Sequence, residues 1–187
     1  MSAPAWLTSH ADEVQAILDR YPQKRSALMP LFHLAQEVRG YVSEEDLAAI
    51  AELTGVTKAY AESVISFYSL YERKPVGKYV IHVCNNIACG LEGSAELIRH
   101  LEERLGIKAG ETTPDGLITL HVTGECIAAC DAAPALQVNL EYCNKVDPEK
   151  ADAIIEAIRR GETPEAIGDM FGGLSLQPTA GFTKSSS

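Results

Sequence analysis

The 187-residue sequence predicts an α/β protein in two units, a helical bundle over residues 1–76 and an α/β sandwich over residues 77–161. Three observations lead to this prediction. Apolar residues have helical spacing up to Pro75-Val76-Gly77 and alternate with polar residues after it. The second part reads as strand, helix, three strands and helix. Two pairs of cysteines follow two of these strands, so we expect both pairs at the same edge of a sheet.

The first unit contains four predicted helices. Sequence signals mark their ends: Ser43 followed by Asp46 resembles a capping box, and Gly40 and Gly55 are typical of residues just past a helix end. The predicted helices cover residues 12–21, 26–38, 44–53 and 57 to about 70.

The second unit alternates between the two kinds of element. Predicted strands cover residues 79–84, 117–122, 135–139 and 142–146, the last two as a hairpin, and predicted helices cover 94–105 and 148–160. Ser94 is the expected N-cap of the first of these helices. This order predicts a sandwich of thioredoxin-like character. Residues 162–187 lack clear periodicity, and we expect a flexible or partner-docking tail there.

The cysteine spacing indicates the chemistry. Cys84 and Cys89 form a C-x₄-C pair, and Cys126 and Cys130 form a C-x₃-C pair. Both spacings are wider than the C-x₂-C usual in structural zinc sites. They suit one [2Fe–2S] cluster, in which each pair of thiolates binds one iron. Four thiolates give such a centre a net charge of −2 when oxidised and −3 when reduced, so nearby backbone N–H groups favour the added electron.

Other interpretations of the cysteines and histidines are less favoured. A structural zinc site lacks its usual spacing, disulfides do not suit an odd number of cysteines, and a thioredoxin-type dithiol would need C-x-x-C. Cys143 belongs to neither pair and is interpreted as an ordinary strand residue. His82 and His121 alternate with apolar neighbours and are interpreted as structural or surface residues.

Composition limits the classes of partner. A formal net charge of −10 opposes binding to nucleic acid, which needs clustered basic residues. The segment 48–57 resembles a helix-turn-helix, but residues 1–75 contain 7 basic and 10 acidic residues, so an iron–sulfur DNA-binding regulator is disfavoured. No apolar run is long enough to insert into a membrane, and no secretory signal is present. We therefore expect a cytoplasmic protein.

Several short segments, in order along the chain, carry a family resemblance. They are Leu34-Ala35-Gln36-Glu37, Gly55-Val56, Phe67-Tyr68, the segment 110–116, Ala133-Pro134 and the two cysteine pairs. With these, residues 26–160 resemble the NuoE-type small [2Fe–2S] subunit of respiratory complex I. The resemblance implies a thioredoxin-like ferredoxin domain behind a helical bundle, with Cys84, Cys89, Cys126 and Cys130 as iron ligands. The chain departs from the family at Ala128 and Asp131, where relatives often have glycine.

The resemblance further implies a function. The chain is expected to be the electron-transfer subunit of an NADH:quinone oxidoreductase, exchanging electrons with the FMN of a partner flavoprotein that binds NADH. A larger iron–sulfur subunit is a second expected partner, and the complex would lie at the inner membrane. No G-x-G-x-x-G motif is present, so NADH and FMN are expected in the partner. Alternatives are the equivalent diaphorase subunit of an NAD-linked hydrogenase or formate dehydrogenase, or a free-standing ferredoxin.

Overall fold

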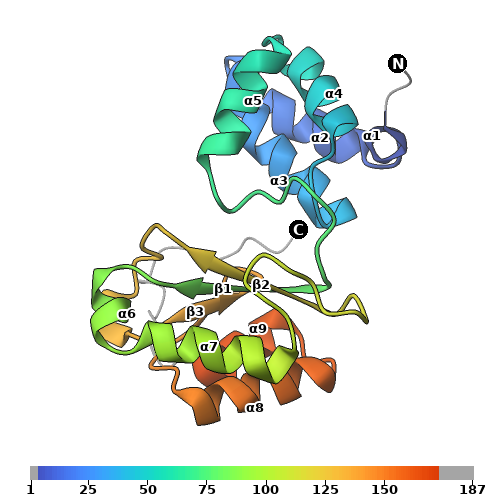
Figure 1. Cartoon of the computed structure of the whole chain (residues 1–187). Coiled ribbons are helices and arrows are strands. Elements are labelled where there is room, and N and C mark those ends of the chain that lie inside the picture. The colour runs from blue at the N-terminus through green and yellow to red at the C-terminus, as the bar shows by residue number, and fades with distance from the viewer. Residues whose placement is uncertain (1–3, 173–187) are drawn as a thin grey trace. The chain divides into compact units, whose positions relative to one another are not determined.

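The computed structural model describes residues 4–172, and the chain divides into two compact units after Lys78 (Figure 1). The division lies two residues beyond the one placed from the sequence. Among the described residues, no helix has the length and apolar character needed to cross a bilayer.

The first unit is helical throughout its described part. It contains α1 (Ala5–Ser9), α2 (Ala11–Asp19), the 3₁₀ helix η1 (Lys24–Ala27), α3 (Leu28–Arg39), α4 (Glu44–Thr54) and α5 (Lys58–Phe67). The predicted second helix begins as η1, and the predicted fourth helix ends at Phe67 rather than near Leu70. Gly40 and Gly55 have positive φ angles of 82° and 70°, which explains why glycine ends α3 and α4.

One buried carboxylate organises the start of α4. Asp46 is fully buried and accepts hydrogen bonds from the Ser43 backbone (2.8 Å), the Ser43 hydroxyl (2.6 Å) and the Trp6 indole N–H (2.6 Å). Arg39 neutralises its charge at 3.1 Å. The predicted capping box is confirmed, and its acid also connects α1 and α3 to α4. Around it, Leu31, Phe32 and apolar residues of the other helices form the core of this unit.

The second unit is a mixed sheet covered by helices. Within the described residues its four strands are β1 (Tyr79–Cys84), β2 (Ile118–Thr123), β3 (Leu136–Val138) and β4 (Glu141–Cys143), in the spatial order β2-β1-β3-β4. β1 and β2 are parallel, whereas β3 is antiparallel to both β1 and β4. The predicted hairpin of the last two strands is confirmed. Its helices are α6 (Ile87–Leu91), α7 (Ser94–Leu105), α8 (Pro148–Arg159) and α9 (Pro164–Phe171), with the 3₁₀ helix η2 (Cys130–Ala132).

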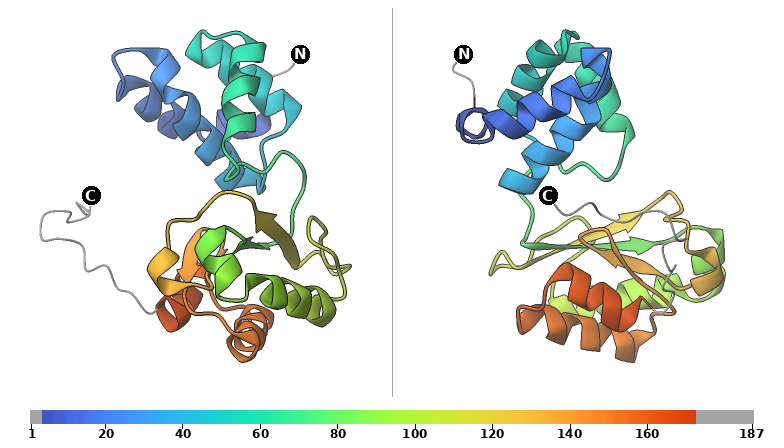
Figure 2. Two further views of the ribbon diagram at one scale, coloured as in Figure 1. Left: turned by 60° about the vertical axis from the view of Figure 1, so that its left-hand side comes forward. Right: turned by 180° about the vertical axis from the view of Figure 1, so that it is seen from behind.

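Helices α7, α8 and α9 lie on one face of the sheet (Figure 2). Alternate strand residues such as Ile81 and Val83 point into the core on this side, where Leu97, Leu101 and Ile155 of the helices meet them. This packing leaves the strand ends and the loops that follow β1 and β2 free to form a site.

Two local predictions were wrong. Ser94 does not cap α7: Gly93 is the N-cap, and the Ser94 hydroxyl instead donates to Asn85 Oδ1 at 2.8 Å. The expected tail also contains a helix, α9, capped by Thr163, with Ile167 fully buried in the core. The signal was present in Thr163-Pro164-Glu165, a typical helix start. The remainder of that predicted tail, residues 173–187, lies outside the described residues.

Candidate iron–sulfur site

The two cysteine pairs lie beyond the ends of two neighbouring parallel strands. Cys84 is the last residue of β1, and Cys89 follows it in α6. Cys126 lies in the loop after β2, and Cys130 begins η2. Because Cys84 is in register with Thr123 at the end of β2, both loops leave the same edge of the sheet, as predicted.

Hydrogen bonds tie the two loops together. Asn86 accepts from the Ile87 N–H at 2.9 Å as the N-cap of α6, and its amide donates to the Gly124 carbonyl of the other loop at 3.2 Å. Asn85 N–H donates to the Thr123 carbonyl at 3.3 Å. Helix α6 was not predicted from the sequence, although an asparagine before a helical turn is a recognised start signal.

The sulfur atoms form one buried pair and one exposed pair. Cys84 and Cys89 are 1% and 2% exposed, whereas Cys126 and Cys130 are exposed, with their Sγ atoms 3.2 Å apart. No three of these sulfur atoms lie within 4.8 Å of one another among the described residues. Cys84 nevertheless lies near enough to Cys126 and Cys130 to affect the pKa values of both, so the four thiols form one group.

The four thiols perturb one another electrostatically. Burial is the main cause that raises the pKa of Cys89 to about 11; a backbone hydrogen bond at Ala135 opposes the rise, and neighbouring Cys84 and Cys130 add to it. The hydrogen bond between the Cys126 and Cys130 side chains lowers the pKa of Cys126, and the Ala128 N–H lowers it further. The same hydrogen bond raises the pKa of Cys130. Four thiolates this close repel one another, so cationic irons would stabilise the deprotonated set.

The two departures from the family pattern lie beside the exposed pair. Ala128 has a φ of 65°, a left-handed conformation that costs an alanine more than a glycine. Its N–H donates to Cys126 Sγ at 3.3 Å. Asp131 is exposed, and its charge contributes to raising the pKa of Cys130. A glycine at position 128, as the resemblance implies for relatives, would adopt this conformation at lower cost.

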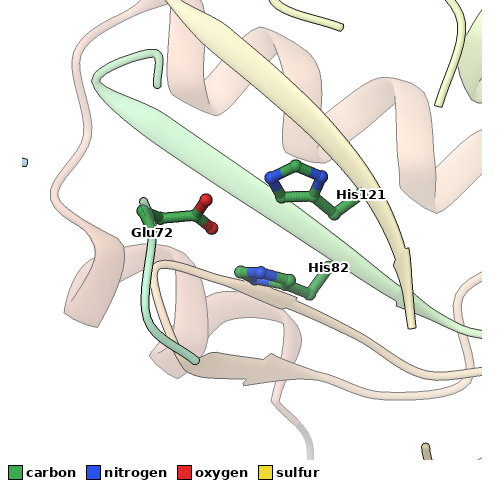
Figure 3. Close-up of side chains that lie close together, drawn as sticks. All are labelled: Glu72, His82 and His121. Carbon is green, nitrogen blue, oxygen red and sulfur yellow. The ribbon is translucent and has the colours of Figure 1, made fainter. Parts of the chain in front are cut away.

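The other candidate side chains lie apart from this arrangement. Cys143 is fully buried in the core of the second unit, and burial raises its pKa to about 12. His82 and His121 face each other across β1 and β2, with ring centroids 5.3 Å apart (Figure 3). The sequence predicted that each histidine is a structural or a surface residue. His82 is buried, so it is structural, and His121 is partly buried.

Comparison with known proteins decides the family. The sequence matches the family described as thioredoxin-like [2Fe-2S] ferredoxin over residues 14–159. The chain belongs to this family. The predicted cofactor, one [2Fe–2S] cluster, is thereby confirmed, whereas the assignment of the individual cysteines as its ligands stays a prediction.

Two relatives bear out the resemblance to the small subunit of complex I. The chain is 40% identical over 156 residues to an NADH-quinone oxidoreductase subunit of Rhizobium meliloti, covering 83% of this chain and 92% of that protein. It is 38% identical over 159 residues to NADH-quinone oxidoreductase subunit 2 of Thermus thermophilus, covering 83% and 87%. The crystal structure of an air-oxidised NAD⁺-reducing [NiFe]-hydrogenase shares the fold, with a TM-score of 0.61 and 24% identity over 72% of this chain and 24% of that one.

Proposed function

We propose that this chain is the [2Fe–2S] electron-transfer subunit of an NADH–quinone oxidoreductase. The observation that carries the proposal is the meeting of two cysteine pairs at one sheet edge, in a chain 40% identical to a component of such an enzyme and covering 92% of that protein. Cys84 and Cys89 would bind one iron, and Cys126 and Cys130 the other. The cluster supplies a one-electron carrier, with its charge changing from −2 to −3 on reduction.

The protein surface around the site favours exchange with a docked partner. The Cys126–Cys130 pair is exposed, so an electron can enter on that side without crossing the core. Ile87 and Leu91 of α6, which flank buried Cys89, are 78% and 83% exposed. Exposed apolar side chains of this kind mark interaction surfaces. The partner we propose is the flavoprotein that binds NADH and FMN, and a larger iron–sulfur subunit would receive electrons in the same complex.

The helical unit offers a second surface. Tyr60, Phe67 and Tyr68 on and just after α5 are 49%, 78% and 38% exposed. Aromatic residues are enriched at protein–protein interfaces, and we propose that they contact the same complex. Through these partners the chain would lie at the cytoplasmic side of the inner membrane.

Metal analysis and NADH titration test the proposal. Anaerobically purified chain should contain two irons and two acid-labile sulfides, by the stoichiometry of the cluster. NADH alone should not bleach its visible absorption, because the flavin belongs to the partner. NADH with the flavoprotein should bleach it. One zinc ion without sulfide would refute the cluster assignment. Rapid bleaching by NADH alone would refute the proposal that NADH and FMN bind to the partner.

A further inference from the structure

One peptide group in the second cysteine loop accepts one hydrogen bond and donates another. Its carbonyl, that of Ile127, accepts from the Tyr142 hydroxyl at 2.6 Å. Its N–H, that of Ala128, donates to Cys126 Sγ at 3.3 Å. The carbonyl and the N–H lie in one rigid plane, so a group that holds one end also sets the direction of the other.

We propose that Tyr142 is a positioning residue for the cluster. Its hydroxyl would fix the orientation of the Ile127–Ala128 peptide, so that the Ala128 N–H points at the sulfur of Cys126 and raises the reduction potential. Tyr142 would act through this peptide and not as a ligand. The inference rests on the proposed ligation by Cys126, and it is independent of the identity of the partner.

The backbone conformation explains why an anchor is needed. Ala128 has a φ of 65°, which is disfavoured by contact of its Cβ with the neighbouring carbonyl. The peptide before it would relax by rotating, which would turn its N–H away from Cys126. The hydrogen bond from Tyr142 opposes this rotation, and its short length is typical of a strong O–H···O bond.

The anchor lies on a paired strand, whereas the loop it holds is exposed. Tyr142 is the central residue of β4 and pairs with Gln137 of β3. The flanking Cys143 is fully buried in the core, which holds the strand in place. Ala128 and the cysteines on either side of it are exposed. A residue of a paired strand that holds a peptide of an exposed loop is a suitable support for the ligand Cys126.

The effect on the potential follows from charge. The reduced cluster carries one more negative charge than the oxidised one, so an N–H aimed at a ligand sulfur stabilises the reduced form more. The hydroxyl also polarises the Ile127 carbonyl, which strengthens donation from the N–H of the same peptide. Both effects have the same sign, and loss of the hydroxyl should lower the potential.

Tyr142→Phe in the full chain tests this inference, since it removes one oxygen and retains the ring. We expect full iron and sulfide content, a more negative reduction potential in an EPR-monitored redox titration, and shifted g-values. Tyr79→Phe is the matched control, because the Tyr79 hydroxyl also donates to a backbone carbonyl of this unit, that of Glu162, at 2.8 Å. That carbonyl lies outside both cysteine loops, so the potential of Tyr79→Phe should equal that of the natural protein.

A double variant separates orientation from general loosening of the loop. Glycine adopts a positive φ without strain, so in Ala128→Gly the peptide should rotate less when the Tyr142 hydroxyl is removed, and the potential should fall by a smaller but measurable amount because the polarisation of the Ile127 carbonyl is still lost. The potential of Ala128→Gly with Tyr142→Phe should therefore lie closer to that of the natural chain than the potential of Tyr142→Phe does. If Tyr142→Phe alone fails to retain its cluster, the double variant supplies the measurement. The potential of the double variant should then lie below that of Ala128→Gly alone.

Two results would overturn the inference. One is an unchanged potential in Tyr142→Phe with an intact cluster. The other is an equal potential in Ala128→Gly with and without Tyr142→Phe. A natural chain without any cluster would be a different outcome, because it would refute the proposed function itself.

Discussion

Replacing Cys143 by serine tests the division of the five cysteines into four ligands and one core residue. Cys143 is fully buried on β4, opposite Leu136 of β3, among apolar side chains. Serine would place a hydroxyl there, and an unpaired buried hydroxyl costs about 1–3 kcal/mol. Alanine removes the polar group and leaves a small cavity, at a cost of about 1 kcal/mol. We therefore expect Cys143→Ser to be less stable than Cys143→Ala, with both retaining iron, sulfide and EPR spectrum.

The pH dependence of stability gives an independent check. The thiol pKa is raised by burial from 9.0 to about 12 in the folded protein. Above pH 9 the unfolded chain loses this proton while the folded chain retains it, so stability should fall between pH 9 and about 12. One proton corresponds to about 1.4 kcal/mol per pH unit within that window. Below pH 9 this residue should contribute no slope.

Urea unfolding of the anaerobic protein over this pH range is the assay, with iron and sulfide determined on the same samples. Cys143→Ala should lack the part of the slope that is due to this one proton. An identical slope in Cys143→Ala and the natural chain would refute the assignment of a buried, protonated thiol. A lost cluster in Cys143→Ser together with an intact one in Cys130→Ser would show that the fourth ligand is wrongly assigned.

The remaining predictions concern a ligand, the helical core and the docking surface. Cys130→Ser should lose the cluster or shift its EPR signal, because a serine hydroxyl is a harder and less acidic ligand than a thiol; an unchanged spectrum would contradict its role. Asp46→Ala should cost about 3 kcal/mol in urea unfolding, since it leaves buried Trp6 N–H and Arg39 without their acceptor, whereas Asp46→Asn should cost less. Phe67→Asp should weaken binding to the flavoprotein about tenfold or more in calorimetry, as expected of an interface aromatic. Ser63→Asp, an exposed position on the same helix, is its control.

Much of the fold could be predicted because its signals are local. Glycines end α3 and α4 in left-handed conformations, and the Ser43–Asp46 capping box starts α4. Strand β1 was predicted with its observed bounds, since β-branched and aromatic residues dominate the segment that ends at Cys84. Helices α6 and α9 were missed although each has a start signal, because five and eight residues are too few for a clear helical period.

Contacts between residues distant in sequence could not be predicted in this way. Ser94 had the residue type of an N-cap, but Asn85 lies within reach of its hydroxyl and takes its hydrogen bond. As an N-cap its oxygen would accept from a backbone N–H, whereas in the fold its O–H donates to Asn85, and the spatial arrangement of the loop decides between these roles. Tyr142 likewise gave no sign of its bond to Ile127, which is 15 residues away and on a different element.

The cofactor, the family and the order of the longer elements could be inferred from the amino-acid order alone. The cofactor could be inferred because spacing within one loop limits which metals a pair of thiolates can bind. Which pair is buried and which is exposed became clear only from the folded domain. The fold also places the two loops at one edge, through the parallel register of Cys84 with Thr123. Burial, register and the donors aimed at each sulfur depend on how β1, β2 and β4 pack together, and packing is a property of the whole domain rather than of any one segment.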